Sequence, residues 1–455
     1  MDTSIFKAYD VRGTYPDQMD EELAYRIGRA FPRVLSELQD IPVTELRVAI
    51  GRDMRLSAPA MSERYARGIA DEGADVLDIG MAGTEMVYWT VGSRSLDGGL
   101  ACTASHNPKS YTGAKLVKRG AIALSGDSGI GELRQIVEAG ADGPPAERPG
   151  EIAREEVGEE FRRAALGYVD ADRIAPMRVV VDGGNGMAGP MLGPLLDSFP
   201  IEQVKTYWEP DGEFPDHEPN PLLPENRGFV VDKVRQTGAD LGIAWDGDAD
   251  RCFFIDDTGE FVAGDFLSAL LAESILRKES GATILYDVRA SRAVRDVVER
   301  AGGCAEVNRV GHAFFKTRMR DTGAAFGGEV SGHYYFRDFY CADSGTIPAL
   351  LILELLSVEG KRMSELLEPL RSRYFISGEI NSDVDDQDAK MRELAERYSD
   401  GRVGWLDGVS VDFDDWHFNV RPSNTEPLLR LNLESVISEE HMAEQRDEVL
   451  GVIRA

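Results

Sequence analysis

Three carboxylates at alternate positions, Asp246, Asp248 and Asp250, directly follow the apolar run 241–245. The run has the composition of a buried strand, so the carboxylates should gather where that strand ends. Mg²⁺ and Ca²⁺ prefer oxygen ligands, and the small residues between the aspartates let the backbone curl around an ion. The cluster therefore predicts a site for a hard cation.

Two other interpretations of this cluster are an acidic turn and a calcium-binding loop. The calcium loop is disfavoured because it requires a bidentate glutamate at its twelfth position, where the shorter Asp257 stands. Arg251 follows the cluster directly. A guanidinium beside a metal site indicates an anionic substrate such as a phosphate.

The bulk composition limits the partners of this 455-residue chain. Its 80 acidic and 50 basic residues give a net charge of −30, which argues against nucleic acid or an anionic membrane as a partner. Any anion site must therefore be built locally from arginine and lysine. The four cysteines are isolated, which is typical of reduced thiols rather than of zinc or redox sites. No basic start precedes an apolar stretch and no run reaches membrane-spanning length, so we expect a soluble cytoplasmic protein.

The elements that position the cluster form a pattern that occurs three times. Each occurrence has three strand candidates, which lie at 47–53, 74–80 and 99–103, at 178–186, 201–208 and 239–245, and at 283–291, 304–310 and 324–328. The third strand is followed by Ser105 in the first unit, by the acidic cluster in the second and by Glu329 and Ser331 in the third. Ligands of α/β sheets gather at the carboxyl ends of strands, so we expect these loops to converge on one cleft.

The domain boundaries and the C-terminal region follow from breaks in this pattern. The Gly- and Pro-rich segment 139–150 reads as a linker, which leads to predicted domains at 1–148, 149–255, 256–371 and 372–455. The last domain contains predicted strands at 378–384, 410–420 and 428–434 and a helix at 389–397. Between its last two strands lie Arg421, Ser423, Asn424 and Thr425, which suit a phosphate; a plain polar turn is the alternative.

Ser105 lacks the Gly-x-Ser-x-Gly elbow of a hydrolase nucleophile. A serine beside a divalent ion has another use, as a phosphoryl carrier whose phosphate completes the coordination of the ion. Taken in isolation, Ser105 would be interpreted as a capping or turn serine.

Together these motifs resemble the α-D-phosphohexomutase family. The resemblance covers essentially the whole chain, is closest to bacterial-type phosphomannomutases, and is carried in order by segments 6–13, 78–85, 103–108, 246–251, 328–333, 377–382 and 421–427. It implies three related α/β domains with mixed sheets and a C-terminal α+β domain around a central cleft. One departure is Val330, where the family commonly has methionine, and another is Pro422, which stiffens the phosphate loop.

The resemblance also implies roles for individual residues. Ser105 would carry the phosphoryl group, and Asp246, Asp248 and Asp250 would hold Mg²⁺ with the serine phosphate as a further ligand. Glu329 and Ser331 would bind sugar hydroxyls, and Arg421, Ser423, Asn424 and Thr425 would hold the phosphate that does not react. The remaining cleft residues would be Tyr9, Arg12, Lys115, Arg251, Arg289, Arg292, His312 and His333.

The implied reaction is that of a phosphohexomutase, in which phosphoserine 105 gives its phosphoryl group to a hexose 1- or 6-phosphate. The resulting hexose 1,6-bisphosphate then returns its other phosphate to Ser105. Lys115, His106 and His333 are all candidates for the general acid or base, and the sequence does not choose among them. We expect mannose phosphates as substrates, then glucose, then glucosamine phosphates; the oligomeric state is not readable. A metal-dependent phosphatase and a non-catalytic sugar-phosphate sensor are the competing hypotheses.

Overall fold

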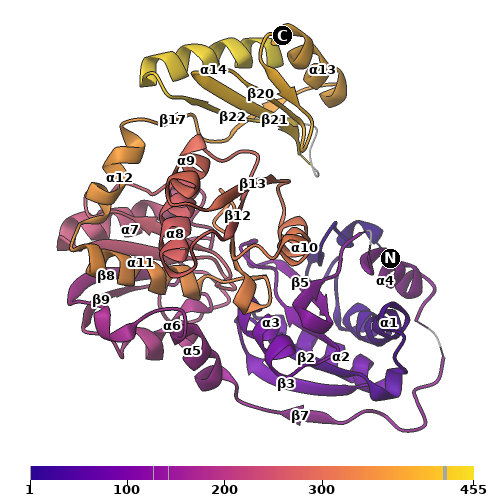
Figure 1. Cartoon of the computed structure of the whole chain (residues 1–455). Helices are drawn as coiled ribbons and strands as arrows, with labels where there is room; N and C mark the ends of the chain where they lie inside the picture. The colour runs from indigo at the N-terminus through magenta and orange to yellow at the C-terminus, as the bar shows by residue number, and fades with distance from the viewer. Residues whose placement is uncertain (1, 127, 142, 424–427) are drawn as a thin grey trace. The chain divides into compact units, whose positions relative to one another are not determined.

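The computed structural model describes residues 2–126, 128–141, 143–423 and 428–455 (Figure 1). The chain folds into two compact units. The first contains residues up to 262 together with 332–360, and the second contains 263–331 and the residues from 361 onward. In the described residues, no helix has the length and apolar character needed to cross a membrane.

The first unit begins with a mixed sheet, as predicted. Its strands are β1 (Val11–Thr14), β2 (Arg47–Arg52), β3 (Asp75–Met81), β4 (Gly98–Cys102), β5 (Tyr111–Lys118), β6 (Ile122–Ala123) and β7 (Ile152–Arg154). The order is β1-β5-β4-β2-β3-β7, with β6 paired to β5. β2 runs parallel to β3 and β4, whereas β5 runs antiparallel to β1 and β4. The Ser105 loop therefore connects two neighbouring antiparallel strands.

Four helices flank this sheet: α1 (Glu21–Gln39), α2 (Ala58–Asp71), α3 (Thr84–Ser93) and α4 (Ile130–Glu138). Val48 and Ile50 share one core with apolar residues of α1, α2 and α4. The alternate positions of the sheet face α3, because a β-carbon at Gly51 would meet Val87 at 2.8 Å. This alternation follows from the two-residue period of a strand.

The segment 139–150, predicted as a linker, is attached to the first sheet and its helices. The amide of Ala146 donates to the carbonyl of Asp71 at 2.7 Å, and the amide of Gly150 donates to that of Ala70 at 2.8 Å. The chain then forms β7, which lies at the outer edge of the sheet beside β3 (Figure 1). The backbone of this segment is thus fixed by hydrogen bonds, although the domain boundary near residue 148 stays a prediction.

The second sheet of this unit carries the acidic cluster. Its strands are β8 (Met177–Asp182), β9 (Ile201–Thr206), β10 (Leu241–Trp245) and β11 (Cys252–Ile255), and its helices are α5 (Gly158–Leu166), α6 (Ala188–Leu196) and α7 (Pro224–Thr237). The order is β11-β10-β8-β9, with β11 antiparallel to β10 and the other pairs parallel. Residues 246–251 therefore form the tight connection of a β-hairpin.

Residues 332–360 return to the first unit as β15 (Tyr334–Phe336), β16 (Ala342–Asp343) and α11 (Thr346–Glu359). All residues of α11 from Thr346 to Leu356 are buried, as expected for a helix that is apolar on every side. The indole nitrogen of Trp245 donates to the carbonyl of Gly345 at 2.9 Å, and the amide of Asp170 donates to Glu354 at 2.8 Å. These bonds anchor the returning segment beside the strand that leads into the acidic cluster.

The second unit begins with three parallel strands. It contains α8 (Gly264–Lys278), β12 (Thr283–Asp287), α9 (Arg292–Arg300), β13 (Cys304–Asn308), α10 (His312–Thr322), β14 (Phe326–Gly328) and, later in the chain, α12 (Met363–Arg371). β12 lies between β13 and β14 and is parallel to both. The loops that contain Arg289 and Glu329 follow the carboxyl ends of adjacent strands.

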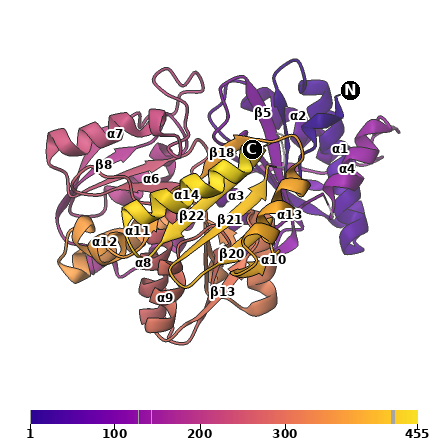
Figure 2. The ribbon, with the colours of Figure 1, turned by 90° about the horizontal axis from the view of Figure 1, so that it is seen from above.

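The C-terminal part of this unit has an antiparallel sheet, which confirms that its fold differs from the α/β domains. It contains β17 (Phe375–Ile376), β18 (Ile380–Asp383), α13 (Gln387–Arg397), β19 (Arg402–Gly404), β20 (Val409–Asp412), β21 (Trp416–Pro422), β22 (Leu428–Ser435) and α14 (Glu439–Ile453). The order is β17-β22-β21-β20-β19, with β18 paired to β22. Figure 2 shows α13 and α14 lying over β20, β21 and β22, and apolar residues of both helices join the core of this sheet.

The predicted single strand 410–420 is wrong. β20 ends at Asp412 and β21 begins at Trp416, and the two strands pair antiparallel with Val411 opposite Phe418. Consecutive aspartates favour a turn because their side chains compete with the ladder for backbone hydrogen bonds, and residues 413–415 contain two of them.

Candidate active site

Ser105 lies in the loop between β4 and β5 and is 3% exposed. Its φ of +49° is left-handed, a conformation that is strained for a residue with a β-carbon. The hydroxyl of Ser105 donates to Oδ2 of Asp246 at 2.9 Å, and its amide donates to Oγ1 of Thr103 at 2.8 Å. The first and second predicted loops therefore meet.

The acidic cluster lies in the β10–β11 hairpin connection. Asp246, Asp248 and Asp250 are at most 1% exposed, and one carboxylate oxygen of each lies within 4.8 Å of those of the other two. A β-carbon at Gly247 would meet the carbonyl oxygen of Ser105 at 2.5 Å. Glycine at this position therefore lets the serine loop pack directly on the hairpin.

Two cations partly neutralise the carboxylates. Nζ of Lys115, on β5, donates to Oδ2 of Asp248 at 2.7 Å and also to Asp250. The guanidinium of Arg251 donates through Nε to Oδ2 of Asp246 at 2.9 Å. Burial alone would lower the pKa of Lys115, but Asp248 and Asp250 outweigh it and hold that pKa well above its usual value.

The three aspartates fit a hard cation. Oδ1 of Asp248 and Oδ1 of Asp250 are buried and have no hydrogen-bond partner among the described residues. Burial and then Asp248 raise the pKa of Asp250 to about 6, because the two carboxylates repel each other. Buried carboxylate oxygens without donors are costly unless an ion binds them, and the all-oxygen set suits Mg²⁺.

His106 and His333, two of the acid–base candidates, lie close to this cluster. Nδ1 of His106 lies 3.2 Å from Oγ of Ser105. Burial, followed by Arg251, lowers the pKa of His106 well below its usual value, which favours the neutral ring. Nδ1 of His333 lies 3.0 Å from Oδ2 of Asp343, and His333, Asp343 and Asp250 each place a ligand atom within 4.8 Å of the others.

Arg12 and Tyr9, two predicted cleft residues, lie in and just before β1. The guanidinium of Arg12 donates to the side chains of Asp10 and Asn107. Asn107 belongs to the serine loop, so Arg12 is connected to the Ser105 site. Tyr9 is half-buried.

In the second unit, Glu329 follows β14 and is 2% exposed. Its Oε2 accepts the amide of Gly311 at 3.0 Å, directly before His312, the first residue of α10. Ser331 is half-buried two residues further along. The carboxylate of Glu329 also lies 3.8 Å from the guanidinium of Arg289. Glu329, predicted to bind sugar hydroxyls, and Arg289, predicted as a cleft residue, are therefore close together.

Arg292 has a different environment. Its guanidinium donates to the carbonyls of Asp414 at 2.9 Å and of Trp416 at 3.0 Å. These contacts hold the β20–β21 turn, so the structure gives Arg292 a structural task beside its predicted role in substrate binding.

Arg421 and Ser423 lie at the β21–β22 turn, whereas Asn424 and Thr425 lie outside the described residues. Arg421 donates to Glu379 at 3.1 Å. Arg430, opposite Arg421 on β22, donates to Glu379 at 3.2 Å and to Ser423 at 3.4 Å. The guanidinium of Arg289 lies 3.4 Å from the same carboxylate. Three arginines thus surround Glu379.

The sequence interpretation missed Glu379, Arg430 and Arg55 as site residues. Arg430 lies on the second strand of the predicted hairpin, but its place opposite Arg421 depends on the strand register, which the sequence interpretation did not fix. Arg55 follows β2 by three residues and carries no sequence signal. Its contacts with the serine loop come from segments about 50 residues apart in sequence.

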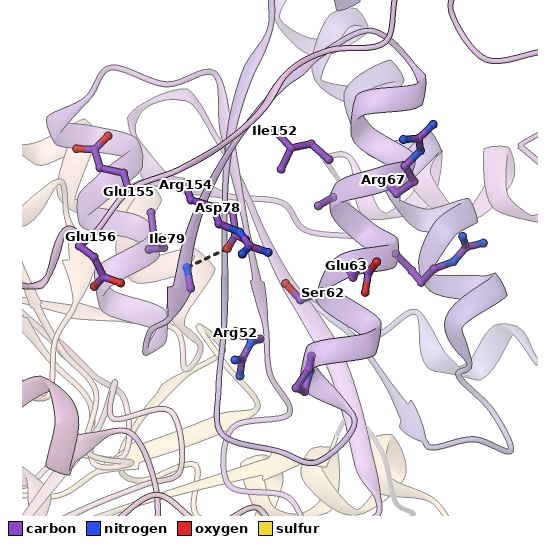
Figure 3. Close-up of a pocket in the computed structure, with 14 residues that line it drawn as sticks. Arg52, Ser62, Glu63, Arg67, Asp78, Ile79, Ile152, Arg154, Glu155 and Glu156 are labelled. Atoms are coloured by element: carbon purple, nitrogen blue, oxygen red, sulfur yellow. Dashed lines mark hydrogen bonds and ion pairs between the residues drawn. The ribbon is translucent and has the colours of Figure 1, made fainter.

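A separate hollow of about 780 Å³ lies between α2 and β7 (Figure 3). Its charged lining residues are Arg52, Arg64, Arg67, Arg154, Glu63, Asp78, Glu155 and Glu156. Arginines and carboxylates are equal in number, so the charge of the hollow favours neither anions nor cations. The predicted catalytic residues do not line it.

Comparison with known proteins gives a consistent assignment. Models described as "Phosphoglucomutase/phosphomannomutase, alpha/beta/alpha" domains I, II and III match residues 3–142, 159–259 and 263–374, and the C-terminal domain model of that family matches 379–452. A "Phosphohexose mutases" protein of Xanthomonas campestris pv. campestris is 44% identical over 94% of each chain. A phosphomannomutase of Vibrio cholerae is 41% identical over 99% of this chain and 98% of its own.

Solved structures agree with this result. A phosphoglucomutase/phosphomannomutase family protein from Burkholderia thailandensis has a TM-score of 0.90 and 32% identity, over 99% of this chain and 97% of its own. The fold and the match over nearly the full chain define a phosphohexomutase, an isomerase-type phosphotransferase. The chain belongs to the phosphoglucomutase/phosphomannomutase family.

Proposed function

We propose that the protein interconverts mannose 6-phosphate and mannose 1-phosphate through phosphoserine 105 and a hexose 1,6-bisphosphate. The observation that carries this proposal is the serine hydroxyl 2.9 Å from Asp246, within a cluster of buried carboxylates. Relatives from Vibrio cholerae and Escherichia coli are phosphomannomutases by name, which favours mannose over glucose and glucosamine. The enzyme would act in the cytoplasm.

The reaction consists of two phosphoryl transfers, one from Ser105 to the sugar and one from the sugar back to Ser105. A free hydroxyl of the hexose phosphate attacks the phosphorus of phosphoserine 105, its oxygen forms the new P–O bond, and the bond to Oγ of Ser105 breaks. The hydroxyl proton leaves to a base and an acid returns a proton to Oγ. The bisphosphate then turns over and gives its other phosphate back to Ser105. Positioning and electrostatics supply most of the catalysis in such transfers.

Asp246, Asp248 and Asp250 would hold Mg²⁺, which supplies charge neutralisation at the transferring phosphoryl group when bound. Arg251 donates a hydrogen bond to Asp246, which holds its guanidinium beside the proposed metal site. Lys115 would keep Asp248 and Asp250 in position, and its protonated amine would face the developing charge.

The proton transfers need a group within reach of Ser105. Nδ1 of His106 lies 3.2 Å from its Oγ, which supports His106 as the group that exchanges a proton with the serine. Lys115 and His333 remain candidates for the sugar hydroxyl. His333 is oriented by its contact with Asp343, in the way a carboxylate commonly orients a catalytic imidazole.

Further residues would bind the sugar and its second phosphate. Glu329 would accept hydrogen bonds from sugar hydroxyls, and Ser331 would exchange hydrogen bonds with them. Arg421, Ser423, Asn424 and Thr425 would hold the phosphate that does not react, and Arg289, Arg292 and His312 would bind substrate as well. Tyr9 and Arg12 would also bind substrate.

Two measurements test this function against the phosphatase and the sensor. Intact-mass spectrometry after incubation with glucose 1,6-bisphosphate should find one phosphate, located on Ser105. Coupled assays with mannose 1-phosphate, glucose 1-phosphate and glucosamine 1-phosphate should give the highest kcat/KM for mannose. Release of inorganic phosphate without isomerisation would establish a phosphatase, and binding without turnover would establish a sensor.

A further inference from the structure

Arg55 makes several hydrogen bonds near Ser105, and its side chain is 1% exposed. It lies after β2, in a segment that the sequence analysis did not connect with the site. Nη2 of Arg55 donates to the carbonyls of Ser105 at 2.9 Å and Asn107 at 2.6 Å. Nη1 donates to the carbonyls of Pro108 at 2.8 Å and Tyr111 at 3.1 Å. One guanidinium therefore binds four carbonyls along the whole serine loop.

Asp53 and Phe214 also contact Arg55. Oδ2 of Asp53 lies 3.3 Å from Nε of Arg55, and Oδ1 accepts the amide of Arg55 at 3.0 Å. The guanidinium also lies 5.3 Å from the centre of the Phe214 ring, which belongs to the second sheet's domain. A β-carbon at Gly212 would lie 2.7 Å from the amide of Leu56, so residues 212–214 pack directly on the Arg55 turn. The Arg55 guanidinium is thus contacted by Asp53 and by the segment 212–214.

We infer that Arg55 is a positioning residue that holds Ser105 in its left-handed conformation, with the hydroxyl directed at Asp246. The carbonyl of Ser105 lies between Arg55 and Gly247, so the loop can approach the acidic hairpin only while the guanidinium satisfies that carbonyl. Lysine cannot replace this arrangement, because its ammonium is a point charge without the planar fork that reaches four acceptors. The inference rests on the proposed phosphoserine mechanism.

The test compares Arg55→Lys with Arg29→Lys in the full-length protein. Arg29 is a matched control because it is also buried, pairs with Glu72, and donates to carbonyls of Gly143 at 2.9 Å and Pro144 at 3.4 Å, away from the serine loop. Both variants should lower the melting temperature, since each loses a buried guanidinium and its hydrogen bonds to backbone carbonyls. Misplacing a reacting group by about 1 Å costs about 100-fold in rate, so kcat of Arg55→Lys should fall by about that factor with KM nearly unchanged.

Arg29→Lys should keep kcat within about twofold of the wild type, because it acts on stability alone. Phosphorylation of Ser105 by glucose 1,6-bisphosphate, followed by intact mass, should be slowed in Arg55→Lys and normal in Arg29→Lys. The inference is overturned if the two variants lose kcat equally, or if folded Arg55→Lys keeps wild-type kcat and phosphorylation.

If Arg55→Lys does not fold, Phe214→Leu takes its place. This change removes the ring that lies 5.3 Å from the guanidinium, so the guanidinium and the serine loop that it holds can shift, and kcat should fall with little change in KM. Unchanged kcat in folded Phe214→Leu would then refute the inference. A wild-type protein without mutase turnover on any of the three hexose phosphates would refute the proposed function instead, so the two failures are distinguishable.

Discussion

Nζ of Lys115 lies 2.7 Å from Oδ2 of Asp248, and it also contacts Asp250. This one ammonium partly neutralises two carboxylates that the hairpin forces together, at the position where Mg²⁺ is proposed to bind. Lys115 comes from β5 and the aspartates from the β10–β11 hairpin. The contact therefore joins the sheet that carries the serine loop to the hairpin that carries the proposed metal ligands.

Replacing Lys115 by methionine should destabilise the protein without metal and make its stability depend on Mg²⁺. Removing one partner of a buried ion pair costs about 3–5 kcal/mol, because the other charge is left buried and unpaired. We expect thermal melts with EDTA to show a large loss, and added Mg²⁺ to recover part of it. Lys109→Met removes an exposed ion pair with Glu213 and is the control, with melting nearly unchanged. Equal melting of Lys115→Met with EDTA and with Mg²⁺ would contradict this.

Replacing Ser105 by alanine should lower kcat by at least about 1,000-fold, because the phosphoryl carrier is lost. Steady-state assays of mannose 1-phosphate turnover measure this loss. Ser110→Ala changes an exposed serine of the same loop and should keep full activity. Incubation with glucose 1,6-bisphosphate should add a phosphate to Ser110→Ala and none to Ser105→Ala. Substantial turnover by Ser105→Ala would refute the phosphoserine mechanism.

Stability should fall as the pH rises, because of Glu85 in α3. Burial raises the pKa of Glu85 from 4.5 to about 8, although hydroxyls of Ser344 and Thr346 donate to its carboxyl group. The folded protein therefore keeps a proton that the unfolded chain releases above pH 4.5. This stabilisation is fully present below pH 4.5 and is lost as the pH rises through 8, by about 1.4 kcal/mol per pH unit.

Urea unfolding between pH 5 and pH 9 measures this contribution. Glu85→Gln should remove it, so the free energy of unfolding should vary less with pH and exceed that of the wild type at pH 9. Exposed Glu63→Gln should retain the pH dependence of the wild type. Parallel curves for the wild type and Glu85→Gln would show that the carboxyl group is ionised in both states.

Glu379 should compete with substrate phosphate for Arg421. Its carboxylate lies 3.1 Å from Arg421, 3.2 Å from Arg430 and 3.4 Å from Arg289, so it is an internal counter-ion in the predicted phosphate site. Glu379→Gln removes the competing charge. Inorganic phosphate should then inhibit about fivefold more strongly, which corresponds to about 1 kcal/mol of binding free energy.

Inhibition constants for phosphate and KM for mannose 1-phosphate test this together, with exposed Asp383→Asn as the control. Weaker phosphate inhibition of Glu379→Gln would mean that the carboxylate orients the arginines rather than competing for them.

Local patterns in the sequence were sufficient for much of the fold. β10 is a five-residue apolar run in which every residue is buried, and it ends at the residue before Asp246 as predicted. Strand ends were less accurate, since the predicted strand 178–186 ends at Asp182 in β8, where the following glycines and asparagine form a turn. The error at 410–420 has the same origin, because apolar residues on both sides of a short acidic turn resemble one continuous strand.

Local sequence was enough to predict the chemistry proposed for the site: carboxylates at alternate positions for a hard cation, a serine after a buried strand, and an arginine-led polar loop for phosphate. These are properties of residues adjacent in the chain, so spacing reveals them. The contacts that these residues make with distant parts of the chain are set only by the folded structure. Lys115 between two aspartates, Arg55 on four carbonyls and Glu379 among three arginines are contacts between distant segments. The distances in these contacts depend on how the sheets and loops pack. Folding buries charged side chains next to each other although they are far apart in the sequence.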